Sequence, residues 1–178
     1  SSNTKLAFIK QEYFERTKET TEELKFQVII HGIEGSELKT NHPVFEDEIE
    51  KLSAGFEPDG SVDQETESLI VYTSGTTGQP KGVVLTQYNL MADAEGISKW
   101  HGICKGTVMM CVLPIHHVNG TVVTIMTSYY AGGQMILNQK FHTDRFFKVL
   151  ADEKVNIVSV VPTLLQFLCH DYENKVDS

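Results

Sequence analysis

The sequence predicts an α/β fold in which a layered, mostly parallel sheet is flanked by helices. The first observation is that short apolar runs alternate along the chain with segments whose apolar residues recur every three to four positions. The second is the stretch 107–113, a nearly unbroken apolar run. Such a run is typical of a parallel strand that is covered on both faces.

The first third of the chain, residues 1–52, is expected to form an acidic strand–helix–strand–helix segment. The expected elements are a strand at 5–9, a helix at 11–25, a strand at 26–30 and a helix that starts at 41–43. Pro43 would lie in the first turn of that last helix, a position that proline favours. Residues 53–67 contain Gly55, Pro58, Gly60 and five acidic residues, which predicts a solvated linker.

The remaining residues, 68–178, are expected to carry the chemistry. The expected strands are 68–72, 82–86, 107–113, 134–137 and 155–161, and the expected helices are 87–101, 121–131, 144–154 and 163–170. Asn119 and Thr143 are candidate N-caps, because their side chains can accept from free helix amides. Met126, Tyr129 and Tyr130 are expected in the core, and Trp100 belongs to an apolar stripe of the helix at 87–101.

Charge and cysteine usage exclude several classes of protein. The net charge of −9 arises entirely before residue 68, and the later residues carry no net charge and no basic stripe, so a nucleic-acid surface is excluded. The cysteines, Cys104, Cys111 and Cys169, are widely spaced. They predict reduced, buried thiols, with no disulfide framework or zinc site. The sequence holds neither a run of about 18 apolar residues nor a secretory pattern, and we expect a cytoplasmic protein.

The stretch from Thr73 to Gly78 consists only of serine, threonine and glycine, and Lys81 follows it. Backbone amides near Gly75 and Gly78 can converge on an anion, and the hydroxyls and the lysine can bind phosphate oxygens. A Walker A loop is excluded, because position 80 is proline and position 82 is glycine. The plain alternative is a hairpin loop without a ligand. The residues predicted to bind phosphate are Thr73, Ser74, Gly75, Thr76, Thr77, Gly78 and Lys81.

A second polar stretch, Leu113–Gly120, contains His116 and His117 at the end of a buried strand. Open α/β sheets bind ligands at this end of their strands. Two ordinary polar loop residues are the alternative, and a metal site is disfavoured, because no third ligand has suitable spacing.

Residues 72–83 closely resemble the signature phosphate loop of the adenylate-forming superfamily, which includes acyl-CoA synthetases, luciferases and peptide-synthetase adenylation domains. Residues 113–120 resemble the second core motif of the acyl-CoA synthetases, in which His117 matches a histidine beside the adenylate. Peptide-synthetase domains usually lack this histidine. Residues 161–163 resemble a helix start that borders the acyl pocket.

The resemblance implies an acid–thiol ligase, with a fatty acid as the expected substrate. Such an enzyme forms an acyl-adenylate from ATP and then an acyl-CoA from coenzyme A. The resemblance implies that His117 is the catalytic neighbour of the adenylate and that His117, Pro162 and Thr163 line the acyl pocket. It also implies that Mg²⁺ bridges the phosphates with Thr77. The alternatives are a fatty acyl-AMP ligase, an adenylation domain that loads a carrier protein, and a non-catalytic remnant.

Several family motifs have no match in the sequence, among them the magnesium-binding glutamate motif, the ribose-binding aspartate motif and the C-terminal catalytic lysine. We therefore expect the chain to be a fragment of the family's large N-terminal domain. On its own it should be inactive, and it should self-associate through uncovered apolar faces and strand edges.

Overall fold

The structure is a computed structural model that describes residues 4–32, 41–73 and 80–176. It divides into two compact units, residues 1–60 and 61–178, and the boundary falls inside the expected linker. Residues 61–66 belong to the second unit. They contact the start of the helix that begins at Gln87, since the amides of Gln87 and Tyr88 donate to the carbonyls of Thr66 and Gln64. This half of the expected linker is therefore part of a packed unit.

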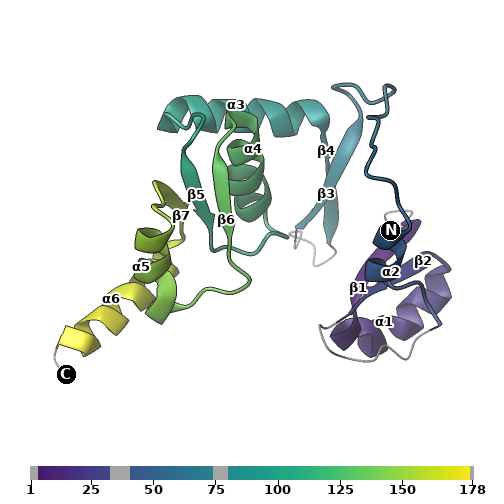
Figure 1. Cartoon of the computed structure of the whole chain (residues 1–178), viewed down its shortest axis with the longest axis horizontal. Coiled ribbons are helices and arrows are strands. Elements are labelled where there is room, and N and C mark those ends of the chain that lie inside the picture. Colours follow the sequence, from purple (N-terminus) through teal and green to yellow (C-terminus); the bar gives the residue numbers. More distant parts are fainter. Residues whose placement is uncertain (1–3, 33–40, 74–79, 177–178) are drawn as a thin grey trace. The chain divides into compact units, whose positions relative to one another are not determined.

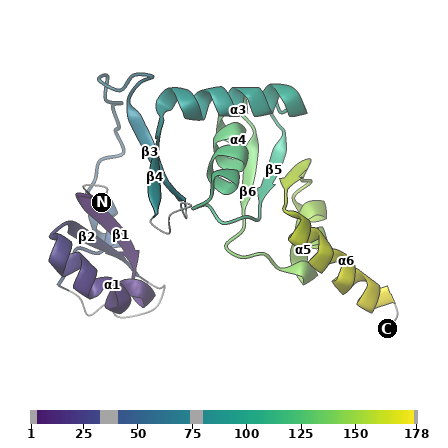
Figure 2. The same cartoon turned by 180° about the vertical axis from the view of Figure 1, so that it is seen from behind.

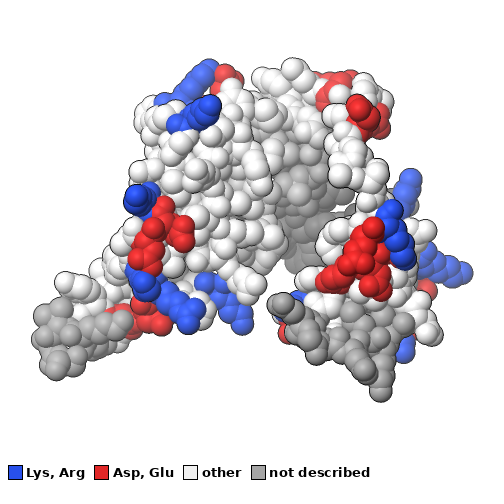
Figure 3. Space-filling model, in the orientation of Figure 1, with Lys and Arg blue, Asp and Glu red and all other residues white. Residues whose placement is uncertain are grey.

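The first unit is a strand–helix–strand unit with one additional short helix (Figure 1). Its elements are β1 (Leu6–Lys10), α1 (Gln11–Leu24), β2 (Gln27–His31) and α2 (Phe45–Glu50). β1 and β2 pair in parallel, and Val28 and Ile30 are buried. Acidic side chains gather over α2 (Figure 3), whose first turn contains Glu46, Asp47 and Glu48.

The predicted start of α2 at residues 41–43 is wrong. The carbonyl of Pro43 accepts a hydrogen bond from the Ile30 amide at 2.9 Å, and Val44 forms a bridge with Ile30. These residues therefore extend the edge of the sheet, and the helix begins only at Phe45. Ile49 and Leu52, which follow Phe45 at helical spacing, are exposed.

The second unit contains a hairpin and a parallel sheet with helices on both sides (Figures 1 and 2). The hairpin pairs β3 with β4 in antiparallel fashion, and the sheet has the order β6-β5-β7 with all pairs parallel. The strands are β3 (Glu67–Thr73), β4 (Lys81–Thr86), β5 (Val108–Cys111), β6 (Gln134–Leu137) and β7 (Ile157–Ser159). The helices are α3 (Gln87–His101), the π-helix η1 (Asn119–Met126), α4 (Thr127–Ala131), α5 (Thr143–Asp152) and α6 (Pro162–Val176).

β5 is the central strand, and it is buried as its apolar run predicted. Met109, Met110 and Cys111 are almost inaccessible to solvent. Successive side chains of a strand face opposite sides of the sheet. Met110 packs with Phe146 of α5 and Leu168 of α6. Cys111 lies on the other side, where its Sγ is 3.9 Å from the carbonyl oxygen of Gly120 in η1.

Local sequence explains where α3 begins and ends. Thr86 accepts from the Asn89 amide at 3.3 Å, and the Asn89 side chain accepts from the Thr86 amide at 2.9 Å. This reciprocal pair satisfies two amides that the first helical turn leaves free. Gly102, at φ 65°, ends the helix in the left-handed conformation that glycine adopts without strain.

Both predicted N-caps are wrong, because each side chain bonds to a distant residue. Asn119 is the first residue of η1, and its Oδ1 accepts from the Ser159 hydroxyl at 2.9 Å. Thr143 is the first residue of α5, and its hydroxyl donates to Asp171 of α6. The predicted helix at 121–131 is a π-helix followed by a short α-helix, although it ends at Gly132 as expected.

Tyr129 and Tyr130, which were expected in the core, are exposed, and so is Trp100 of the predicted apolar stripe. Trp100 is 86% exposed, Tyr129 is 72% exposed and Tyr130 is 41% exposed. The core that covers this side of the sheet consists instead of small residues, among them Ala94, Val122 and Thr127. Of the cysteines, only Cys111 is buried, so the expectation of buried thiols fails for Cys104 and Cys169.

Candidate functional site

The β3–β4 hairpin brings together the two described ends of the predicted phosphate loop. Thr73 and Lys81 are register partners at the last rung of the hairpin, and the Thr73 hydroxyl donates to the Lys81 carbonyl at 3.5 Å. Both residues are exposed. A hydroxyl and an ammonium group therefore stand at the same end of the hairpin, as a phosphate site requires. The other residues of the predicted loop, Ser74, Gly75, Thr76, Thr77 and Gly78, lie outside the described residues.

Gly82 allows the hairpin to close tightly below this end. A Cβ at Gly82 would lie 3.1 Å from Cγ2 of Ile70 and 3.4 Å from Cε1 of Tyr72. These two side chains occupy the space that a side chain at position 82 would fill. A side chain at position 82 would therefore displace the Ile70 side chain slightly.

The turn that contains His117 follows β5 and is fastened to η1. The His117 amide donates to the Pro114 carbonyl at 3.1 Å, and the His117 carbonyl accepts from the Thr121 amide at 3.0 Å. The Thr121 hydroxyl also donates to the Ile115 carbonyl. The backbone of the turn is therefore held from both sides, while the two imidazole rings remain exposed with centroids 4.4 Å apart.

Gly120 is required for this arrangement. A Cβ at this position would lie 2.5 Å from the Pro114 carbonyl oxygen and 3.0 Å from Cα of Ile115. Those distances are too short for any side chain. Only glycine therefore lets the first turn of η1 lie against residues 114–117, which we call the histidine turn. The buried Cys111 thiol lies beneath the same contact, and burial raises the pKa of this thiol, which favours its neutral form.

The hydrogen bond between Asn119 and Ser159 joins the histidine turn to the other predicted pocket residues. Ser159 ends β7, and Pro162 and Thr163 follow as the first residues of α6. The bond therefore connects Asn119, the first residue of η1, to the strand that leads into α6. Pro162 and Thr163 are both exposed.

The loop after β5 also runs toward the hairpin. Figures 1 and 2 both draw residues 112–118 running toward the end of the hairpin at which Thr73 and Lys81 lie. The candidate site thus consists of one end of the hairpin and the turn that holds His117, and the bond between Asn119 and Ser159 links that turn to the strand before α6. The hairpin, the turn and the strand all belong to the second unit.

Sequence reasoning missed the contributions of Ser159 and of the Asn119 side chain. Ser159 is a polar residue inside the apolar run 155–161. A polar side chain in a buried strand needs a hydrogen-bond partner. Ser159 was therefore the signal in the sequence that this strand bonds to a polar residue of another element. In the part of the chain that the structure describes, no group of three or more His, Cys, Asp or Glu side chains is placed to hold a metal ion. No helix among the described residues is long and apolar enough to cross a membrane.

Two CoA ligases are similar in sequence to this chain. The sulfoacetate–CoA ligase of Cupriavidus necator is 38% identical over 104 residues, which is 58% of this chain and 20% of that protein. The mitochondrial malonate–CoA ligase ACSF3 of Mus musculus is 30% identical over 183 residues, which is 98% of this chain and 28% of that protein. The chain thus spans well under a third of the length of these relatives.

Solved structures share the fold. Apo MatB from Rhodopseudomonas palustris matches 94% of this chain with a TM-score of 0.80 at 23% identity, and the match covers 31% of MatB. The MenE synthetase from Bacillus subtilis, solved with ATP and magnesium ion, matches 93% of the chain with a TM-score of 0.72 at 24% identity. The model of the AMP-binding enzyme family matches residues 1–177, and the chain therefore belongs to that family.

Proposed function

We propose that this chain is the phosphate-loop part of an ATP-dependent carboxylic acid–CoA ligase. The observation that carries the proposal is the hairpin of residues 67–86, which joins the Thr73 hydroxyl and Lys81 at one end within a chain of the AMP-binding family. Because the chain spans 20% to 28% of the relatives compared, the complete reaction is proposed for the longer gene product.

The proposed reaction has two steps. A carboxylate oxygen of the acid attacks the α-phosphorus of ATP, the bond to the β-phosphate breaks, and pyrophosphate leaves with its charge neutralised. The thiol of coenzyme A then attacks the acyl carbonyl, loses its proton, and AMP leaves. The first step depends on positioning and electrostatic stabilisation.

The residues of this chain would serve the first step. Thr73 and Lys81, with the loop between them, would hold the β- and γ-phosphates, and His117 would border the acyl-adenylate. Magnesium ion would neutralise phosphate charge when bound. Its expected protein partner, Thr77, lies outside the described residues. The exposed imidazole of His117 stands on a turn whose backbone is fastened to η1, which supports a positioning task.

The acid is proposed on separate grounds. The sequence resemblance implied a fatty acid, whereas three of the relatives are named as ligases for sulfoacetate, malonate and indoleacetate. We propose a compact acid that carries a further polar or aromatic group. Coenzyme A is the proposed acceptor, and a carrier-protein thiol is the alternative. The expected cytoplasmic location remains a prediction, since ACSF3 is mitochondrial by name.

Acid-dependent exchange between ATP and labelled pyrophosphate tests the proposal. The chain and its complete gene product would be compared with malonate, sulfoacetate, indoleacetate and fatty acids of increasing length. Exchange by the complete product with one acid class, followed by transfer to coenzyme A, would support the ligase. Absence of exchange with every acid would refute it, and transfer only to a carrier protein would favour the alternative acceptor.

Lys81→Ala tests the phosphate site directly. Loss of a charged transition-state contact costs ~10–1000-fold in rate, so exchange by the complete product should fall within this range. Lys105→Ala is the matched control, because Lys105 is an exposed lysine outside the candidate site. Equal exchange rates for the Lys81 variant and the unaltered protein would remove Lys81 from the proposed role.

A further inference from the structure

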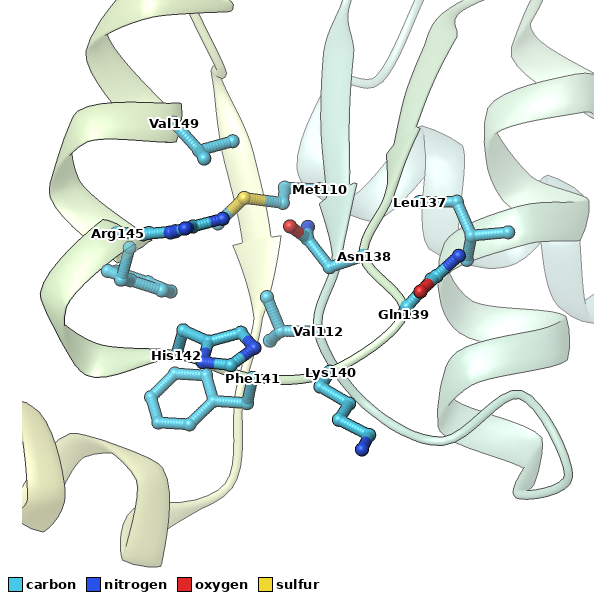
Figure 4. Close-up of a pocket in the computed structure, with 11 residues that line it drawn as sticks. Met110, Val112, Leu137, Asn138, Gln139, Lys140, Phe141, His142, Arg145 and Val149 are labelled. Carbon is cyan, nitrogen blue, oxygen red and sulfur yellow. The ribbon is translucent and has the colours of Figure 1, made fainter. Parts of the chain in front are cut away.

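A cavity of about 390 Å³ lies between α5 and the carboxyl ends of β5 and β6 (Figure 4). The carboxyl ends of parallel strands are the usual ligand-binding edge of an open α/β sheet. One part of the wall is apolar and consists of Met110, Val112, Leu137, Phe141, Phe146 and Val149. The polar part includes Asn138, Lys140, His142 and Arg145. An apolar wall with a few polar groups is typical of small-molecule sites.

The charged groups of this cavity are all basic. In Figure 4 the Arg145 side chain extends from α5 across the cavity toward the carboxamide of Asn138. No acidic residue lines the cavity, and none of the ion pairs between described side chains includes Arg145 or Lys140. By contrast, Lys148 on the same helix pairs with Asp152 at 2.6 Å. A guanidinium group without a protein anion beside an apolar wall favours an oxyanion ligand, which it can bind in bidentate fashion.

This cavity lies on the other face of β5 from the turn that holds His117. Met110 and Val112 of the β5 segment face the cavity, whereas Cys111 between them faces Gly120 and η1. The histidine turn is fastened to η1, on the Cys111 side of the sheet. A ligand beside Arg145 would therefore occupy the opposite face of the sheet from the contact between Cys111 and Gly120.

We propose that the cavity binds a small organic oxyanion, a carboxylate or a phosphate monoester, that carries a compact apolar group. Arg145 would bind the oxyanion, with positive charge added at the rim by Lys140. Met110, Val112 and Phe146 would contact the apolar group. Arg145 is exposed, so the ligand can reach it without opening the core.

Titrations of the chain followed by ¹⁵N–¹H NMR test the proposal. The probes are benzoate and phenyl phosphate, with inorganic phosphate and neutral benzyl alcohol as comparisons. We expect saturable shifts of the Val112, Asn138 and Phe146 amides with benzoate or phenyl phosphate, and the tighter of the two identifies the oxyanion. Inorganic phosphate should bind more weakly than phenyl phosphate because it lacks the apolar group, and benzyl alcohol should bind at least about 10-fold more weakly because it lacks the charge.

Arg145→Gln should weaken binding about 10- to 100-fold, the effect of losing a charge-assisted hydrogen bond. Lys148→Gln, on the same helix and outside the cavity lining, should leave the affinity within about twofold. Since Arg145 is exposed, its replacement should leave the dispersed NMR spectrum intact. Lack of saturable shifts, equal binding of benzyl alcohol, or unchanged affinity of the Arg145 variant would each overturn the proposal. None of these results depends on the ligase activity.

Discussion

Gly120→Ala should destabilise the second unit and displace the histidine turn. The added Cβ would lie 2.5 Å from the Pro114 carbonyl oxygen and 2.9 Å from its carbonyl carbon. Cβ atoms essentially never come closer than 3.0 Å to another heavy atom, so the backbone must move by at least about 0.5 Å. The same carbonyl accepts the His117 amide, so this movement also weakens the bond that positions His117.

The expected cost follows from these contacts. Overpacking of a well-packed site costs about 1–3 kcal/mol, and a weakened hydrogen bond adds about 0.5–1.5 kcal/mol. We therefore expect a loss of about 3 kcal/mol in the free energy of unfolding. For a chain of this size, such a loss lowers the melting temperature by about 6–12 °C.

Urea and thermal unfolding, followed by circular dichroism, measure this cost, and the ring proton resonances of His117 report the displacement. Gly96→Ala is the matched control, because Gly96 lies within α3 and a Cβ there would meet nothing within 4 Å. Alanine in a helix interior is about 0.5–1 kcal/mol more favourable than glycine, so this control should be slightly more stable. If Gly120→Ala unfolds like the unaltered chain and leaves the His117 resonances in place, the argument from close approach is wrong.

The remaining predictions concern one hydrogen bond, the thiols and self-association. Ser159→Ala should cost about 0.5–1.5 kcal/mol in urea unfolding and speed hydrogen exchange near Asn119, because it removes the 2.9 Å bond between them; unchanged exchange would contradict the joining role. Iodoacetamide should label Cys104 and Cys169 in the folded chain and Cys111 only after unfolding, since Cys111 is buried with a raised pKa. Mass spectrometry of the labelled peptides measures this, and equal labelling of the three cysteines in the folded chain would contradict the prediction. The isolated chain should form dimers or larger species through its exposed apolar residues, and light scattering that finds a monodisperse monomer would count against this.

The sequence predicted the strand and helix order well because period and end signals agree over most of the chain. The apolar run of β5 predicted a strand buried on both faces, and Met110 and Cys111 are indeed buried toward opposite sides. The start of α3 was predictable because its cap is local, with Thr86 and Asn89 three residues apart. Thr73 and Lys81 were predicted to share one site, and the hairpin register makes them partners.

Two of the failures occur where a side chain bonds to a partner far away in the sequence. Asn119 and Thr143 have the side chains of N-caps, but their partners, Ser159 and Asp171, lie 40 and 28 residues away. Rules for caps consider only nearby residues, so they cannot anticipate such bonds. Trp100 fits an apolar stripe of α3 and is nevertheless exposed. Periodicity predicts which face of a helix is apolar, but it does not predict how much of the helix length is covered by other elements.

The alternation of side chains along β5 also affects how this protein can change over generations. Neighbouring codons of this strand serve different faces of the sheet, since Met110 and Val112 contact the cavity beside α5 while Cys111 contacts η1. A mutation at Met110 or Val112 can reshape the cavity while the histidine turn keeps its support. A mutation at Cys111 can alter the contact with η1 while the cavity keeps its shape. Selection can therefore tune the two faces of the sheet independently, although a single short strand carries both.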